Sequence, residues 1–243
     1  MLIQKNPLTM LGTISRCWLF VYKTPISDAK RFLPPQLEPV QYNNYSFWNV
    51  VVCQVKNMRP QLCLLPMGIT YWHVAYRVYV RVRPRENENI EGLYFLRSDC
   101  NNSLISMVGN LLTDFNFHTA KVSVHENDQS INISIASQGS NDQAIINKVE
   151  QPLLLADSVF NSLDEASQFL KYKPNGISIQ RDGLANITHI VRDEQAWQSK
   201  LVYVERAQWA YFKDKNVSFE ICYEVEPIAY QWNRAKIYKC ESF

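Results

Sequence analysis

Four histidines are the side chains in this sequence best suited to acid–base or metal chemistry: His73, His118, His125 and His189. An imidazole titrates near neutral pH, so a histidine that lines a pocket can act as a general acid or base. None of the four stands in the HExxH spacing of a zinc protease or beside the GxSxG turn of a serine hydrolase. The sequence also lacks a Walker loop and a GxGxxG segment. The motifs therefore give no support to metal, triad or nucleotide chemistry, and a surface or core role is the simpler interpretation of each histidine.

A second group of polar side chains lies on one predicted strand. Between Thr70 and Arg83, valines and a tyrosine alternate with His73, Arg77 and Arg81. A period of two is typical of a strand with one apolar and one basic face. If the sheet closes into a barrel, the basic face looks into the lumen and its arginines converge on an anion. If the sheet is open, the same face is solvated, and the sequence fits both arrangements.

Strands predominate in the rest of the chain, with a few helices between them. Period-two alternation recurs in residues 120–124, 131–135, 201–204 and 217–223, and the polar residues 126–129 predict an antiparallel hairpin between the first two of these segments. One short helix is expected after Pro25, with Ser27 or Asp28 as its cap, and another near Ser162, where Glu165 completes a capping box. A third helix is expected with Ser103 as its cap and with one apolar face made of Leu104, Val108, Leu111, Leu112 and Phe115. The expected fold class is α+β, with mainly antiparallel strands.

Composition bounds the class of protein. The chain has 243 residues, 47% hydrophobic and 20% charged, so it can form a large core, and we expect one domain over residues 1–243. A formal net charge of +2 disfavours a nucleic-acid partner. The apolar run from Cys17 to Tyr22 is too short for a signal peptide, and no run reaches the length of a membrane span, so we expect a cytoplasmic protein without membrane insertion.

The cysteines and aromatic residues carry two further expectations. Six cysteines are scattered without a CxxC pair or a Cys/His cluster at metal spacing, so we expect reduced thiols, no bound metal and no cofactor. The sequence also holds 13 Tyr, 11 Phe and 6 Trp, which suit either a wide core or the wall of an apolar cavity.

A family resemblance is carried by several segments. The segment FVYKTPISDAKRFLPPQLEPV, from Phe20 to Val40, resembles the N-terminal signature of the acetoacetate decarboxylase-like superfamily, with its Leu-Pro-Pro-x-Leu turn. GLYFLRSD (92–99), FLKYKPNGISI (169–179) and His189 followed by Trp197 resemble a domain-of-unknown-function branch of that superfamily. The resemblance implies a twisted antiparallel β-barrel or a two-sheet cone with an apolar central pocket.

The resemblance also shows what this chain lacks. The decarboxylase mechanism needs a desolvated lysine beside another cation, which forms a Schiff base with a β-keto acid. Phe117 and His118 take the place of the family's two consecutive lysines, and no Lys-Lys pair occurs in this sequence. Pro66 and Met67 stand near the position of a pocket glutamate, whereas Arg16 stands where the family has a pocket arginine. The resemblance thus implies an anion site that has lost the usual lysine chemistry.

One lysine and one histidine remain as substitutes. Lys121 would replace the missing lysine only if it turned inward, and its alternation with Ala120 and Val122 predicts that it points to solvent. His118 would act as a general acid or base if it lined the pocket.

Three functions follow from the sequence. The preferred one is binding of a small organic acid or another apolar anion in the barrel pocket, without Schiff-base decarboxylase activity, by a protein that is either monomeric or a homo-oligomer. The ligand-binding residues expected for this function are Arg16, Arg77, Trp18, Trp48 and Phe117. The first alternative is an enzyme of lyase or hydrolase type that uses His118 or His189 with arginine assistance. The second is a protein-interaction module whose barrel is filled by its own side chains.

Overall fold

The structure is a computed structural model, and it describes residues 5–63, 67–85, 89–148, 154–170, 173–180, 182–193 and 198–243. Its framework is a closed ring of hydrogen-bonded strands, in which each strand pairs with the next and the last pairs with the first. In ring order these strands are β1 (Met10–Pro25), β4 (Tyr45–Pro60), β5 (Ile69–Val82), β6 (Ile90–Cys100), β10 (Asn175–Ile179), β11 (Ala185–Arg192) and β15 (Ile228–Trp232). The β6–β10 pair is parallel, and the other pairs in the ring are antiparallel.

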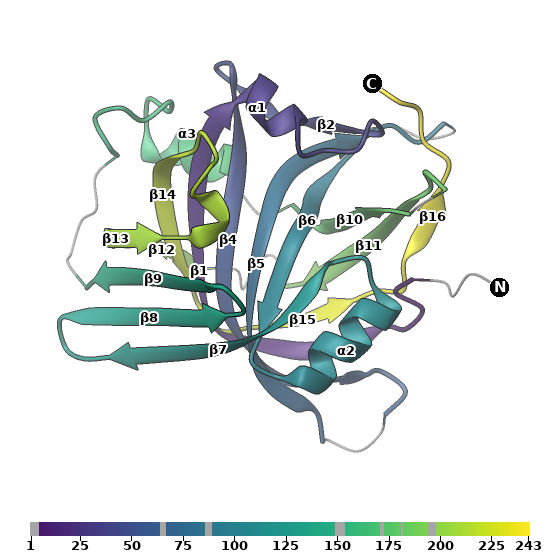
Figure 1. Cartoon of the computed structure of the whole chain (residues 1–243), viewed down its shortest axis with the longest axis horizontal. Coiled ribbons are helices and arrows are strands. Elements are labelled where there is room, and N and C mark those ends of the chain that lie inside the picture. Colours follow the sequence, from purple (N-terminus) through teal and green to yellow (C-terminus); the bar gives the residue numbers. More distant parts are fainter. Residues whose placement is uncertain are drawn as a thin grey trace.

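A second layer covers one outer side of the ring. It is a sheet made of β7 (Phe117–Glu126), β8 (Ser130–Ser137), β9 (Ser140–Asn147) and β13 (Tyr203–Gln208), and its strands run across β1, β4 and β5 (Figure 1). A parallel pairing of β6 with β7 joins the layer to the ring. The antiparallel pairing of β7 with β8 confirms the predicted hairpin. Five further strands pair with the ring or with one another: β2 (Leu37–Pro39) with β5, β3 (Gln41–Tyr42) with β4, β14 (Ser218–Val225) with β1, β12 (Ser199–Leu201) with β14, and β16 (Lys236–Tyr238) with β11. A 3-10 turn, η1 (Ala210–Phe212), precedes β14.

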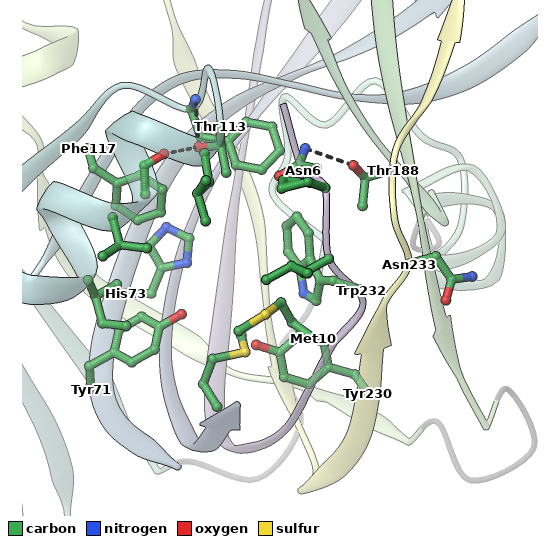
Figure 2. Close-up of a pocket in the computed structure, with 18 residues that line it drawn as sticks. Asn6, Met10, Tyr71, His73, Thr113, Phe117, Thr188, Tyr230, Trp232 and Asn233 are labelled. Atoms are coloured by element: carbon green, nitrogen blue, oxygen red, sulfur yellow. Dashed lines mark hydrogen bonds between the residues drawn. The ribbon is translucent and has the colours of Figure 1, made fainter. Parts of the chain in front are cut away.

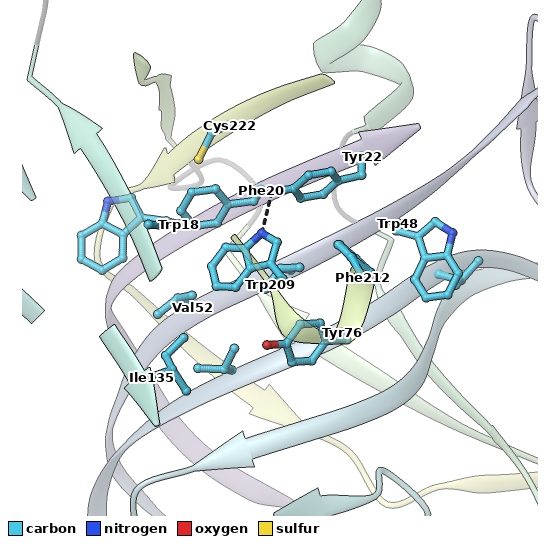
Figure 3. Packing of buried hydrophobic residues seen from close by; sticks show 14 of the residues in the cluster. Trp18, Phe20, Tyr22, Trp48, Val52, Tyr76, Ile135, Trp209, Phe212 and Cys222 are labelled. Atoms are coloured by element: carbon cyan, nitrogen blue, oxygen red, sulfur yellow. Dashed lines mark hydrogen bonds between the residues drawn. The ribbon is translucent and has the colours of Figure 1, made fainter. Parts of the chain in front are cut away.

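Alternation along the long strands creates two separate apolar cores. On β5, Val74, Tyr76 and Val78 face the second layer, where they meet isoleucines of β8 and the rings around η1. Figure 3 shows this core, in which Trp209 and Phe212 pack against rings from β1, β4 and β5. The other face of β5 belongs to a second cluster inside the ring. Since successive side chains point to opposite faces of a strand, one set of long strands supplies both cores.

Three helices were expected, and the structure has α1 (Ile26–Lys30), α2 (Ser103–Leu112) and α3 (Leu163–Leu170). The cap of α3 is confirmed, because the backbone N–H of Glu165 donates to Ser162 Oγ at 3.1 Å. The caps expected for the other two are wrong. Pro25 precedes α1 without a side-chain cap, and Asn102, not Ser103, accepts the capping bond of α2 from the N–H of Ile105.

The predicted fold class is confirmed: the described chain is mainly β, with three short helices and a twisted sheet whose strands close on themselves. In the part of the chain that the structure describes, none of the helices has both the length and the apolar character needed to cross a lipid bilayer.

Candidate functional site

A cavity of about 60 Å³ lies inside the ring, and we call it the inner cavity. Every ring strand except β10 contributes to its wall: Ile14, Cys17, Leu19, Val51, Cys53, Val55, His73, Arg77, Phe95, Ile190, Arg192, Tyr230 and Trp232. Two arginines, from β5 and β11, are the charged members of this wall, and no carboxylate or lysine stands among the described residues that form it. The inner cavity is therefore small and largely apolar, with two arginine side chains in its wall.

Arg77 is fixed in the wall by a buried polar network. Its side chain is only 7% exposed, and its Nε donates to Asn49 Oδ1 at 2.7 Å from the directly opposite position on β4. Asn49 in turn donates to the hydroxyl of Tyr79 at 3.2 Å. The guanidinium carbon of Arg77 lies 5.5 Å from the ring centroid of Phe95, within the range of a cation–π contact. These contacts hold a cation in a desolvated place, where its attraction for an anion is strong.

Beside Arg77, polarisable and titratable side chains form a row of cross-strand neighbours on β1, β4, β5 and β6. Cys17 and Cys53 are direct partners on β1 and β4, Cys53 and His73 are partners on β4 and β5, and His73 pairs with Cys100 of β6. Burial lowers the pKa of His73 to about 3, and the nearby charge of Arg77 adds to this effect. Burial raises the pKa of Cys53 to about 12. At neutral pH the imidazole is uncharged and the Cys53 thiol keeps its proton, so neither neutralises the arginines.

A larger cavity of about 140 Å³ adjoins the first, and we call it the outer cavity. It lies between the N-terminal segment, α2 and the ends of β5, β11 and β15, and Figure 2 shows its wall. Apolar side chains predominate: Leu8, Met10, Met58, Ile105, Val108, Leu112, Phe115 and Phe117. Polar contacts are few, among them the bond from Asn6 Nδ2 to Thr188 Oγ1 at 2.9 Å. No carboxylate or lysine side chain lines the described wall of this cavity either.

Three residues line both cavities: His73, Tyr230 and Trp232. We call them the shared wall. Figure 2 places His73 on one side of the outer cavity and Trp232 on the facing side. The two spaces therefore adjoin at an imidazole, a phenol and an indole.

Arg16 does not line either cavity, which corrects the predicted arrangement. It forms an ion pair with Glu126 of β7, its guanidinium carbon lies 4.8 Å from the ring centroid of Trp18, and its side chain is 30% exposed. The physical reason is an irregularity in the β1–β4 pairing between Ile14 and Arg16. Ile14 and Cys17, three residues apart, both line the inner cavity. An extra residue between them reverses the alternation and turns Arg16 away from the ring interior.

The two predicted tryptophans share this outward direction. Trp18 is fully buried against the second layer and stacks on Trp72 at a centroid distance of 6.2 Å. Trp48 packs edge-on against Phe212 in the same core. Neither indole lines the inner or the outer cavity, so their expected role in enclosing a ligand is corrected to a role in packing.

Alternation also separates the remaining predicted residues. Phe117 lines the outer cavity, but the next residue on β7, His118, is exposed. Likewise Thr188 lines the outer cavity and the next residue on β11, His189, is exposed with its Nδ1 at 3.1 Å from Asn175 Oδ1. Lys121 is exposed, as its neighbours on β7 predict. The structure thus brings Arg77 and Phe117 to the cavities and leaves both predicted catalytic histidines outside them.

Sequence reasoning did not find several residues of the site: Cys17, Cys53, Phe95, Arg192, Tyr230 and Trp232. A signal was present in some of them, because Ile190 and Arg192, and also Tyr230 and Trp232, stand two apart on strands and so share a face. The pattern does not say which face of a strand becomes the interior, since that depends on how the ring closes.

The model of the DUF2071 family, whose description reads uncharacterized conserved protein, matches residues 13–173. The chain belongs to the DUF2071 family. No curated protein shows significant sequence similarity to it.

Solved structures similar to this DUF2071 protein share its fold at low sequence identity. Acetoacetate decarboxylase from Legionella pneumophila superimposes with a TM-score of 0.64 at 11% identity, over 95% of this chain and 87% of that one. An acetoacetate decarboxylase-like enzyme from Sphingomonas wittichii RW1 gives 0.58 at 10% identity, over 97% and 94% of the two chains. The enduracididine biosynthesis enzyme MppR, complexed with the condensation product of pyruvate and imidazole 4-carboxaldehyde, gives 0.60 at 9% identity, over 97% and 90%. The predicted superfamily resemblance is confirmed at the level of fold and family.

The structure places some of the residues at which the sequence was expected to depart from the decarboxylase pattern. Phe117 contributes a ring to the outer cavity and stacks on His73 at a centroid distance of 5.3 Å. Of the two residues near the expected glutamate position, Met67 is 75% exposed and Pro66 lies outside the described residues. Trp197, from the resembling His189 segment, also lies outside them.

Proposed function

We propose that this protein binds a small organic anion in the cavity inside its strand ring, and that it does so without Schiff-base decarboxylation. The observation that carries the proposal is the inner cavity itself, whose wall holds Arg77 and Arg192 among apolar side chains and thiols. A guanidinium in a desolvated cavity recognises a carboxylate by charge-assisted hydrogen bonds, while the apolar wall supplies affinity for carbon. MppR, a structure of similar fold, is complexed with pyruvate in one of its forms, which fits an acid of this kind.

The missing lysine supports the second half of the proposal. A Schiff base needs an uncharged amine that touches the substrate, and no lysine lines the described wall of either cavity. Lys23 is buried on β1, but its Nζ is already held by Glu220 at 3.0 Å, and it lines neither cavity.

The two alternatives receive less support. An acid–base enzyme that uses His118 or His189 would need these side chains at a cavity, but both are exposed and neither lines the inner or the outer cavity. A solidly filled barrel would leave no space for a ligand, whereas one cavity lies inside this ring and a second adjoins it. A cytoplasmic location stays a prediction from the sequence, which leaves both a monomer and a homo-oligomer open.

Isothermal titration calorimetry of butyrate, benzoate and octanoate, each against its amide, tests the proposal. We expect the acids to bind more tightly than the amides and the Arg77→Met variant to weaken acid binding by at least about tenfold, because a buried charged hydrogen-bonding group is removed. Arg16→Met is the matched control, since it removes an arginine that lies outside the cavities, and its affinities should equal those of the unmodified protein.

Two results would contradict the proposal. One is equal binding of acids and amides, and the other is a loss of acid binding in Arg16→Met but not in Arg77→Met. Borohydride trapping with acetoacetate, read by mass spectrometry of the intact chain, tests the missing chemistry, and we expect no lysine adduct.

A further inference from the structure

We infer that His73 and Trp232 recognise an uncharged oxygen in the middle of an elongated organic anion, whose charged group lies beside Arg77 and Arg192 and whose apolar end lies in the outer cavity. This inference rests on the proposed function and names the class of ligand: a hydroxylated or otherwise oxygen-bearing acid with an apolar tail. It follows from the polar atoms that the shared wall presents to both cavities.

The first observation is a pair of nitrogen atoms without hydrogen-bond partners in the described structure. His73 Nε2 and Trp232 Nε1 are both inaccessible to bulk solvent, and neither has a hydrogen bond to a described residue. His73 is 8% exposed, so more than nine-tenths of it is buried. A buried polar atom that is left unpaired costs free energy, and a ligand that offers an oxygen to it removes that cost on binding.

The position of these two nitrogens separates them from other unpartnered indoles. Trp18 Nε1 and Trp48 Nε1 also lack partners among the described residues, but both lie in the packed core between the layers. His73 and Trp232 instead line the inner and the outer cavity. They face each other across the outer cavity in Figure 2, in the wall that the two cavities share.

The charge state of His73 decides what kind of group it takes. Its direct neighbours on the sheet are the thiols of Cys53 and Cys100, and its ring stacks on Phe117 and is tilted against Tyr71. Arg77 stands four residues further along β5. No carboxylate faces it among these groups. The burial that lowers the pKa of this imidazole keeps it neutral. A neutral imidazole and an indole N–H favour a neutral oxygen over a second anionic group.

The ends of the ligand follow from the two walls. The inner cavity has the arginines and takes the anionic group. The outer cavity has Met10, Met58, Ile105 and Leu112 and takes an apolar tail. Methionine and leucine side chains adapt to flexible alkyl chains, so the wall suits an alkyl tail of variable length.

The test is calorimetric titration with octanoate, 2-hydroxyoctanoate and 3-hydroxyoctanoate, with butyrate as the short reference acid. We expect at least one hydroxyoctanoate to bind about fivefold or more tightly than octanoate, as one added net hydrogen bond would give. His73→Phe and Trp232→Phe should each reduce this preference for the hydroxylated acid, measured within each variant as the ratio of the dissociation constants of octanoate and the hydroxyoctanoate. The control is Trp48→Phe, which removes an indole N–H from the packed core and lines neither cavity, and it should keep the preference. Thermal unfolding of each variant shows that it is folded.

The outcomes separate this inference from the function beneath it. If the acids bind through Arg77 but octanoate and both hydroxyoctanoates bind equally, the inference is overturned and the proposed function stands. The same holds if His73→Phe and Trp232→Phe retain the full preference. If no acid binds better than its amide, the proposed function fails and the inference fails with it.

Discussion

Cys17 and Cys53 show how single residues acquire their character from the ring. They are direct cross-strand partners, both line the inner cavity, and both are buried. Burial raises the pKa of the Cys53 thiol to about 12 and raises that of Cys17 as well, where the neighbouring Cys53 adds to the effect. Because the thiolate is the reactive form of cysteine, these side chains serve as small apolar wall groups and not as nucleophiles.

Alkylation rates test this. Treatment with iodoacetamide at pH 8, followed by peptide mass spectrometry, should modify the half-buried Cys63 and Cys240 first. Cys17, Cys53, Cys100 and Cys222 are buried and should react at least about tenfold more slowly in the folded protein, since the reagent cannot reach them and burial disfavours the thiolate. The control is the protein unfolded in about 6 M guanidinium chloride, in which all six cysteines should react at similar rates. Rapid modification of Cys17 or Cys53 in the folded protein would show that the ring opens far more than its packing implies.

At the scale of elements, the sequence predicted the strands and the helices more closely than the direction of their side chains. The basic face of β5 and the hairpin of β7 and β8 follow from alternation alone. Arg16 could not be placed in this way, because the irregularity in β1 changes the face without changing the residue pattern. The apolar stripe of α2 also misled: Leu104 and Leu111 are exposed, and Val108 is exposed as well although it lines the outer cavity with Ile105, Gly109 and Leu112. A helix that covers a cavity mouth buries less than its hydrophobic periodicity suggests.

The parallel contact between β6 and β10 closes the ring, and two glycines test it. A Cβ on Gly92 would lie 2.5 Å from the backbone oxygen of Asn175 and 2.7 Å from a carbon of Ile177, so the strands would have to separate. A Cβ on Gly176, on the partner strand, would meet nothing closer than 3.5 Å. Gly92→Ala should therefore lower the free energy of unfolding by about 1–3 kcal/mol, and Gly176→Ala should change it by less than about 1 kcal/mol. Urea unfolding followed by fluorescence measures both, and equal effects would mean that this contact does not limit ring closure.

At the scale of the whole molecule, the sequence indicated a hollow, strand-rich fold, and the ring with its adjoining cavities has that character. What the sequence could not supply is which arginines face inward, because Arg77 and Arg192 come from strands more than a hundred residues apart and meet only when the ring closes. The same closure buries His73 without a carboxylate among its direct neighbours on the sheet. The stability of the entire fold is thereby coupled to the protonation of one residue.

That coupling has a definite sign. The pKa of His73 falls from 6.5 to about 3 on folding, so between these values the unfolded chain binds a proton that the folded chain does not. The free energy of unfolding therefore decreases as the pH falls below about 6.5, by up to about 1.4 kcal/mol per pH unit from this residue. Above pH 6.5 the histidine is neutral in both states and contributes no pH dependence.

Urea unfolding of the unmodified protein and of His73→Phe, at several pH values between 7.5 and about 4.5, isolates this contribution. Carboxyl groups also contribute to the pH dependence. Burial acts to raise the pKa of Glu91, but its bonds to Lys173 and Arg81 lower it overall, and burial raises the pKa of Asp99. Both are present in the two proteins and cancel in the difference. Below pH 6.5 we expect the free energy of unfolding of the unmodified protein to fall relative to that of His73→Phe, with the slope that uptake of about one proton gives. Tyr71→Phe is the control, because it changes a neighbouring group that carries no charge in this range, and it should follow the unmodified protein. If the free energies of unfolding of the unmodified protein and His73→Phe run parallel against pH, the imidazole takes up its proton in the folded protein. The shared wall would then be open to water, contrary to the packing of β4, β5 and β6.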